Sequence, residues 1–102
     1  MFTRGTTPSI NFDFGINLSQ LDIADLYLSF SQNNTVLFEK TKDDVEFFDT
    51  YISVSLSQTE TLKLKSDELL YIQSRIKLDN GECYASNIIK SYVSDVLKDG
   101  EI

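Results

Sequence analysis

Residues 69–92, which read LLYIQSRIKLDNGECYASNIIKSY, decide the fold. The first half of this stretch alternates between apolar and polar positions, and its apolar residues are Leu70, Ile72, Ile76 and Leu78. Successive side chains of a strand point to opposite faces, so the alternation predicts a half-buried strand with a hydrated outer face. The turn sequence at residues 79–81, Asp-Asn-Gly, tolerates the positive φ angles of a tight hairpin. We therefore predict a hairpin whose second strand covers residues 82–92.

A hairpin is not stable alone in water, so the rest of the chain must supply a layer that covers it. Alternation predicts further strands at residues 9–14, 26–32, 35–40, 45–48 and 51–56. In the second of these, Leu26, Leu28 and Phe30 are expected to face inward. Residues 17–25 are interpreted as a loop that packs Leu21 and Ile23 under the edge of the sheets, with Ser19 capping a short helical turn.

One helical turn is predicted near residues 57–62. Ser57 and Glu60 have the spacing of a capping box, in which each side chain accepts a hydrogen bond from the other residue's backbone N–H. A turn at this place carries the chain from one sheet to the other. The sequence therefore predicts an all-β fold, a two-sheet antiparallel immunoglobulin-like sandwich of about seven strands, with an open barrel as the alternative.

The length of 102 residues corresponds to one domain, covering residues 1–102. Residues 1–8 are expected to form a flexible N-terminal arm, because Pro8 has no N–H to donate to a sheet. Residues 98–102 are expected to be a mobile tail, preceded by Val96 and Leu97, which are expected to dock on the domain.

The net charge of −7 comes from 16 acidic and 9 basic residues, and the basic residues are scattered. Nucleic-acid binding requires a cationic face, so we predict no nucleic-acid partner. No signal peptide and no apolar run of membrane-spanning length is present, so we also predict no membrane partner and synthesis in a reducing cytoplasm. The single Cys83 is interpreted as a small buried apolar residue.

Residue chemistry argues against an enzyme. The chain has no histidine, which removes His-dependent triads and histidine metal sites. Its four glycines are too far apart to form a phosphate-binding loop. The acidic residues Asp43, Asp44, Glu46 and Asp49 leave a bound cation as a minor alternative, but their spacing matches no known loop. We predict no catalytic residues, no cofactor and no metal.

The aromatic residues divide into two groups. Phe12, Phe14, Phe30 and Phe38 have core parity, whereas Tyr27, Tyr51, Tyr71 and Tyr84 are expected to face outward. Exposed tyrosines stabilise sheets as cross-strand pairs, and they also recur in protein interfaces and in sugar-binding platforms. The candidate interaction surface comprises Phe2, Arg4, Tyr27, Tyr71, Arg75 and Tyr84.

The phrases MFTRGTTPSINF, SFSQNNTVLFEK, LSQTETLKLK, IQSRIKLDNGECYASN and VLKDGEI span nearly the whole chain. They resemble small proteins encoded among the structural genes of phages and prophages of Gram-positive bacteria. The strand plan is similar to that of the immunoglobulin-like N-terminal domain of phage baseplate upper proteins. The resemblance implies a virion component of the tail or baseplate, present in several copies and bound to other phage structural proteins. It brings no functional residues with it.

Two alternatives to the structural role remain open. One is a carbohydrate- or receptor-binding module that uses the exposed tyrosines. The other is a soluble phage inhibitor of a host protein.

Overall fold

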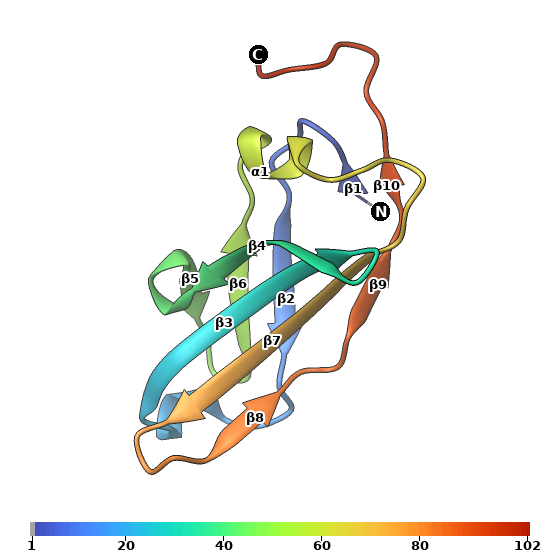
Figure 1. The fold of residues 1–102 in the computed structure, drawn as a ribbon. Helices are drawn as coiled ribbons and strands as arrows, with labels where there is room; N and C mark the ends of the chain where they lie inside the picture. The colour runs from blue at the N-terminus through green and yellow to red at the C-terminus, as the bar shows by residue number, and fades with distance from the viewer. Residues whose placement is uncertain (1) are drawn as a thin grey trace.

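The structure is a computed structural model that describes residues 2–102; Met1, part of the predicted arm, lies outside the described residues. Two antiparallel sheets face each other, and a short pair of strands joins the chain ends (Figure 1). The predicted all-β, two-sheet antiparallel class is confirmed. The strands are β1 (Phe2–Thr3), β2 (Ser9–Asp13), β3 (Ile23–Gln32), β4 (Thr35–Thr41), β5 (Val45–Phe47), β6 (Tyr51–Ser55), β7 (Leu70–Leu78), β8 (Cys83–Ala85), β9 (Ile89–Ser91) and β10 (Val93–Ser94).

Strands β3 and β7 lie at the centre of the five-stranded sheet, in which β4 flanks β3 while β8 and β9 both pair with β7. This central pair runs antiparallel from the pairing of Ile23 with Leu78 to that of Ser31 with Tyr71. Its inner face is apolar except for Ser74 and Gln32, which are both almost fully buried. The cross-strand pairs on that face are Leu26 with Ile76, Leu28 with Ser74 and Phe30 with Ile72.

The three-stranded sheet, of order β2-β6-β5, covers this inner face. In Figure 1, β2 and β6 pass behind β3 and β7 at an oblique angle. Phe12 of β2 and the pair Ile52 and Val54 of β6 are almost fully buried, as their alternation predicts. One contiguous core results, and it also includes Leu18, Leu56, Leu64 and Val93 from outside the two sheets.

Helix α1 (Gln58–Leu62) connects the two sheets, and its capping box is confirmed. Ser57 Oγ accepts from the backbone N–H of Glu60 at 3.2 Å, and Glu60 Oε1 accepts from that of Ser57 at 2.9 Å. Glu60 also forms an ion pair with Lys40 of β4 at 2.6 Å, and these side chains are only 19% and 14% exposed. Burial alone would raise the pKa of Glu60, but the hydrogen bonds from Lys40 and Ser57 bring it below its ordinary value.

A β-bulge in β4 changes which side chains face the core. Phe30 pairs with Phe38, but the next residue, Ser31, pairs with Val36, so Leu37 is an extra residue in β4. Phe38 accordingly faces inward and stacks on Phe30 with ring centroids 4.6 Å apart. Val36, expected on the same side as Phe38, faces outward and is 52% exposed.

The predicted return strand at residues 82–92 is wrong as a single element, because it is divided into β8 and β9. The pairing register with β7 shifts by one residue between Ala85, opposite Arg75, and Ile89, opposite Ile72. Ser86 lies in the gap, where its hydroxyl accepts from the backbone N–H of Ser74 at 3.0 Å. A side chain therefore replaces one ladder hydrogen bond at this position, while the backbone N–H of Ser86 still donates to the Ser74 carbonyl at 2.8 Å.

The expected loop at residues 17–25 is shorter than predicted, because β3 begins at Ile23. A 3-10 turn, η1 (Leu18–Gln20), occupies the first part, and Asn17, not Ser19, caps it. The other 3-10 turn, η2 (Lys42–Asp44), connects β4 to β5.

The β7–β8 turn yields a first prediction. Gly81 has a φ of +92° and nothing within 4 Å of an added Cβ, so its requirement for glycine comes from the backbone alone. Gly81→Val should destabilise the fold by about 1–2 kcal/mol, the cost of a left-handed conformation. Asp79→Ala in the same turn serves as the control in thermal melts. Equal melting temperatures for the two variants would contradict this account of the turn.

The Lys40–Glu60 pair yields a second prediction. Since the pKa of Glu60 is lowered in the fold, the pair contributes stability above the ordinary pKa of 4.5 and loses it as the pH falls through the lowered pKa. Glu60→Gln keeps a capping-box side chain but removes the charge, and should cost about 1 kcal/mol at neutral pH. In denaturant titrations, the difference from the native chain should shrink as the pH falls through the lowered pKa and vanish below it. A difference that persists unchanged at low pH would refute the electrostatic origin.

Candidate functional site

The six residues of the predicted interaction surface are divided among three places. Tyr27, Tyr71 and Arg75 share the outer face of the five-stranded sheet. Phe2 and Arg4 lie at the joined chain ends, where both are largely covered. Tyr84 pairs with the inward-facing Ile76, so it lies on the inner side of the edge strand β8. The predicted single surface is therefore not formed.

The outer face of the five-stranded sheet is open: no element among residues 2–102 packs over it (Figure 1). Tyr27 of β3 lies opposite Arg75 of β7, and Tyr71 lies opposite Ser31. Between these two pairs, Ser29 opposes Gln73. Small polar residues thus form the middle of the face, with a tyrosine toward each end.

Two hollows on this face share Ser29, and together we call them the open-face groove. One has a volume of about 330 Å³ and is lined mainly by Asp25, Tyr27, Ser29, Glu39, Arg75 and Lys77. The other, of about 350 Å³, is lined mainly by Ser31, Val36, Tyr71, Gln73 and Ile88.

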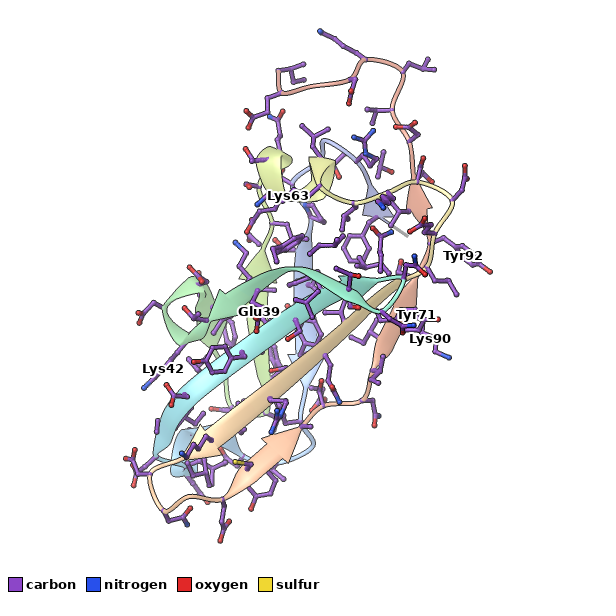
Figure 2. The ribbon with its side chains drawn as sticks, in the orientation of Figure 1. Glu39, Lys42, Lys63, Tyr71, Lys90 and Tyr92 are labelled. Carbon is purple, nitrogen blue, oxygen red and sulfur yellow. The ribbon has the colours of Figure 1, made fainter. Side chains whose placement is uncertain are left out.

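The charged side chains of the groove are free of ion pairs within residues 2–102. Asp25 lies opposite Lys77 in the strand pairing but makes no ion pair with it, and Arg75 makes no side-chain hydrogen bond to any described residue. Glu39 accepts one long hydrogen bond, of 3.4 Å, from Ser29. Beyond the second hollow, Lys90 lies over the ring of Tyr71 with its Nζ 5.9 Å from the centroid (Figure 2).

The chain ends form a second ordered region, which we call the terminal clasp: residues 2–4, 58–59 and 92–102. Strand β1 pairs in parallel with β10, Phe2 opposite Val93 and Thr3 opposite Ser94. Both termini consequently lie at the same end of the molecule (Figure 1). Residues 2–4 of the predicted flexible arm are held in place by this pairing.

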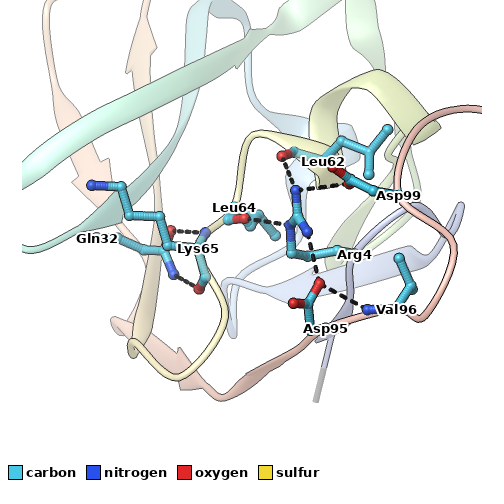
Figure 3. Close-up of polar contacts among 8 residues, drawn as sticks. All are labelled: Arg4, Gln32, Leu62, Leu64, Lys65, Asp95, Val96 and Asp99. Carbon is cyan, nitrogen blue, oxygen red and sulfur yellow. Dashed lines mark hydrogen bonds and ion pairs between the residues drawn. The ribbon is translucent and has the colours of Figure 1, made fainter.

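Arg4 links the N-terminal segment to the C-terminal segment and to the chain at residues 62–64 (Figure 3). Its guanidinium donates to the carbonyl oxygen of Leu62, the last residue of helix α1, at 3.1 Å. It also donates to the carbonyl oxygen of Leu64, just after the helix, at 2.9 Å. It also forms ion pairs with Asp95 at 2.7 Å and Asp99 at 3.4 Å. The hydrogen bond from Arg4 lowers the pKa of Asp95, and the backbone N–H of Val96 adds to the effect.

The C-terminal residues are attached to helix α1. The Gln58 side chain donates to the carbonyl of Ile102 at 3.2 Å and accepts from its N–H at 2.9 Å, and the Thr59 hydroxyl donates to Glu101. The predicted mobile tail is therefore hydrogen-bonded to the domain. The predicted docking of Leu97 is wrong, because its side chain is fully exposed.

Local contacts describe the surroundings of three further residues that the sequence analysis named: Cys83, Tyr84 and Asp44. Cys83 is exposed, not buried, because it lies on the outer face of the edge strand. The Tyr84 hydroxyl donates to Glu82 at 2.9 Å, which raises the pKa of Tyr84. Asp44 accepts from the backbone N–H of Thr41, which lowers the pKa of Asp44.

Within residues 2–102, no group of three or more acidic or cysteine side chains is placed to hold a metal ion. Asp44 of the acidic corner caps the η2 turn instead. None of the helices in this range is long and apolar enough to cross a membrane.

No family model matches the chain, and no curated protein or solved structure is significantly similar to it. The resemblance to phage structural proteins and to the baseplate domain therefore stays a prediction.

The terminal clasp yields a third prediction. Arg4→Ala removes two carbonyl hydrogen bonds and two ion pairs, and should destabilise the fold by roughly 2 kcal/mol. Arg75→Ala is a matched control, because the Arg75 side chain has no such partner among the described residues. Chemical denaturation of both variants measures the difference. Equal stabilities would mean that the Arg4 contacts contribute nothing to the fold.

Proposed function

We propose that this chain is a non-enzymatic structural module of a phage particle, in the tail or baseplate, that binds neighbouring subunits. The resemblance of the sequence to phage structural proteins supports the location. The lack of any histidine supports the non-enzymatic role. The module would function in the virion, in several copies.

The proposed subunit-binding role rests on one observation: apolar side chains of the terminal clasp are exposed to solvent. Leu97 and Ile102 are 110% and 90% exposed, and Tyr92, beside β10, is 68% exposed (Figure 2). The segment that bears them is nevertheless fixed by Arg4 and Gln58. Exposed apolar groups on an ordered segment bind a protein partner with little loss of conformational entropy.

The clasp also fits a role in assembly because of its location. Both chain ends lie together at one end of an elongated molecule with axes of 47, 26 and 18 Å. A partner that binds this end leaves the two sheets and the open-face groove uncovered. Several copies could therefore be arranged around a common neighbour by the same contact.

The fourth prediction tests this function in particles. Mass spectrometry of gradient-purified particles from an induced culture of the source strain should find the chain at stoichiometric levels. Leu97→Ser combined with Ile102→Ser should reduce its incorporation several-fold, because the apolar contact is lost. Val36→Ser, at an exposed apolar position on β4, is the matched control and should be incorporated normally.

The contradicting outcomes are distinct. Detection of the native chain only in the soluble fraction would refute the virion role and favour an inhibitor of a host protein. Normal incorporation of the double variant would retain the virion role but refute the terminal clasp as the contact. Thermal melts of each variant establish that the fold is intact.

A further inference from the structure

The open-face groove has a size and direction that suit an extended ligand. Tyr27 and Tyr71 lie on neighbouring strands and are displaced by four residue positions, because Tyr71 opposes Ser31. At a rise of about 3.3 Å per residue, their attachment points are separated by roughly 13 Å along the strands. The shared lining residue Ser29 makes the two hollows between them continuous.

The groove offers hydrogen-bond donors and acceptors in comparable number. Asp25 and Glu39 supply carboxylate oxygens, while Arg75 and Lys77 supply N–H donors. These four charges cancel, although the whole chain has a net charge of −7. A ligand therefore needs no charge of its own to match the groove.

The same composition argues against other ligand classes. Charged residues are depleted from the cores of protein interfaces, and burying this set under a protein would leave several charges without partners. A nucleic acid would lie against two carboxylates, and the groove has no row of cationic residues that could bind its phosphates. A purely apolar ligand would leave the same charges desolvated.

A neutral sugar chain satisfies each feature. Its hydroxyl groups donate to carboxylates and accept from a guanidinium in charge-assisted hydrogen bonds. The apolar face of a sugar ring packs on a tyrosine ring, and Tyr27 is 49% exposed on this face. Tyr71 lies farther along the groove with Lys90 over one side of its ring, and its remaining surface would contact a different ring of the same chain.

We propose that the open-face groove, formed by Asp25, Tyr27, Glu39, Tyr71 and Arg75 with Ser29 in its floor, binds a neutral oligosaccharide chain that lies along β3 and β7. Arg75 and the two carboxylates bind the hydroxyl groups, and the tyrosines pack on the rings. This site is separate from the terminal clasp, so it does not depend on the proposed assembly role.

The experiment titrates the full chain, labelled with ¹⁵N, with cello-, chito- and malto-oligosaccharides, and with DNA and a polyuronic acid as anionic probes. At least one neutral series should shift the amide signals of residues 25–31 and 71–77. Tyr27→Ala and Arg75→Ala should each weaken that binding by roughly tenfold, as expected for the loss of one charge-assisted or stacking contact. Tyr92→Ala, at an exposed tyrosine outside the groove, is the matched control and should bind as the native chain does.

Three results would overturn the proposal: no shift with any neutral series, shifts confined to residues outside the groove, or binding of the anionic probes alone. An equal loss of affinity in Tyr92→Ala would overturn it as well. Because the shifts are mapped on the native chain, a variant that fails to fold does not affect the test. Particle incorporation of Leu97→Ser with Ile102→Ser is independent of every one of these outcomes.

Discussion

The antiparallel pairing of β3 with β7 is the constraint on which the rest of the structure depends. It places the apolar halves of two long alternating strands on one face, where Leu28 and Ile72 are fully buried. A slip of one residue would turn that whole face to solvent, so the register is strongly determined. Strands β4, β8 and β9 extend this pair sideways, and the three-stranded sheet covers its inner face. The chain passes between the two layers through η1, η2 and helix α1. The Lys40–Glu60 ion pair holds α1 against β4.

Covering one face of a sheet leaves the other open, and this asymmetry separates the two candidate surfaces. The outer face is polar at its centre because every second residue of β3 and β7 needs no apolar partner. The terminal clasp arises differently, since it depends on contacts between residues distant in sequence, such as Arg4 with Asp95. One surface is thus a consequence of strand periodicity, and the other is a consequence of how the ends meet. Their chemistry differs accordingly, with balanced charges in the groove and isolated apolar side chains at the clasp.

The sequence predicted what short-range patterns encode. Alternation identified the inward residues of β3 and β7, and the spacing of Ser57 and Glu60 identified the cap of α1. It also placed Tyr27, Tyr71 and Arg75 on the outer face. The bulge at Leu37 could not be predicted in this way. A regular hairpin with its turn at Asn33-Asn34 would pair Glu39 with Leu28, on the inner face of the sheet. The extra residue at the bulge places Glu39 opposite Ser29 instead, and so in the groove. No local signal distinguishes a strand with this bulge from a regular one.

The chain ends show the same limit at longer range. Residues 2–4 are too few to show a strand period, and their partners in β10 are about ninety residues away in the chain. Arg4 is held because its planar, five-donor side chain can reach carbonyls and carboxylates at once, a capacity that composition does not reveal. This contact determines where the tail lies and hence which apolar side chains remain in solvent. From the sequence, Leu97 was expected to dock on the domain and Arg4 to belong to an interaction surface. The observed arrangement reverses both, so the surface available to a partner is set by the one interaction that the sequence pattern could not show.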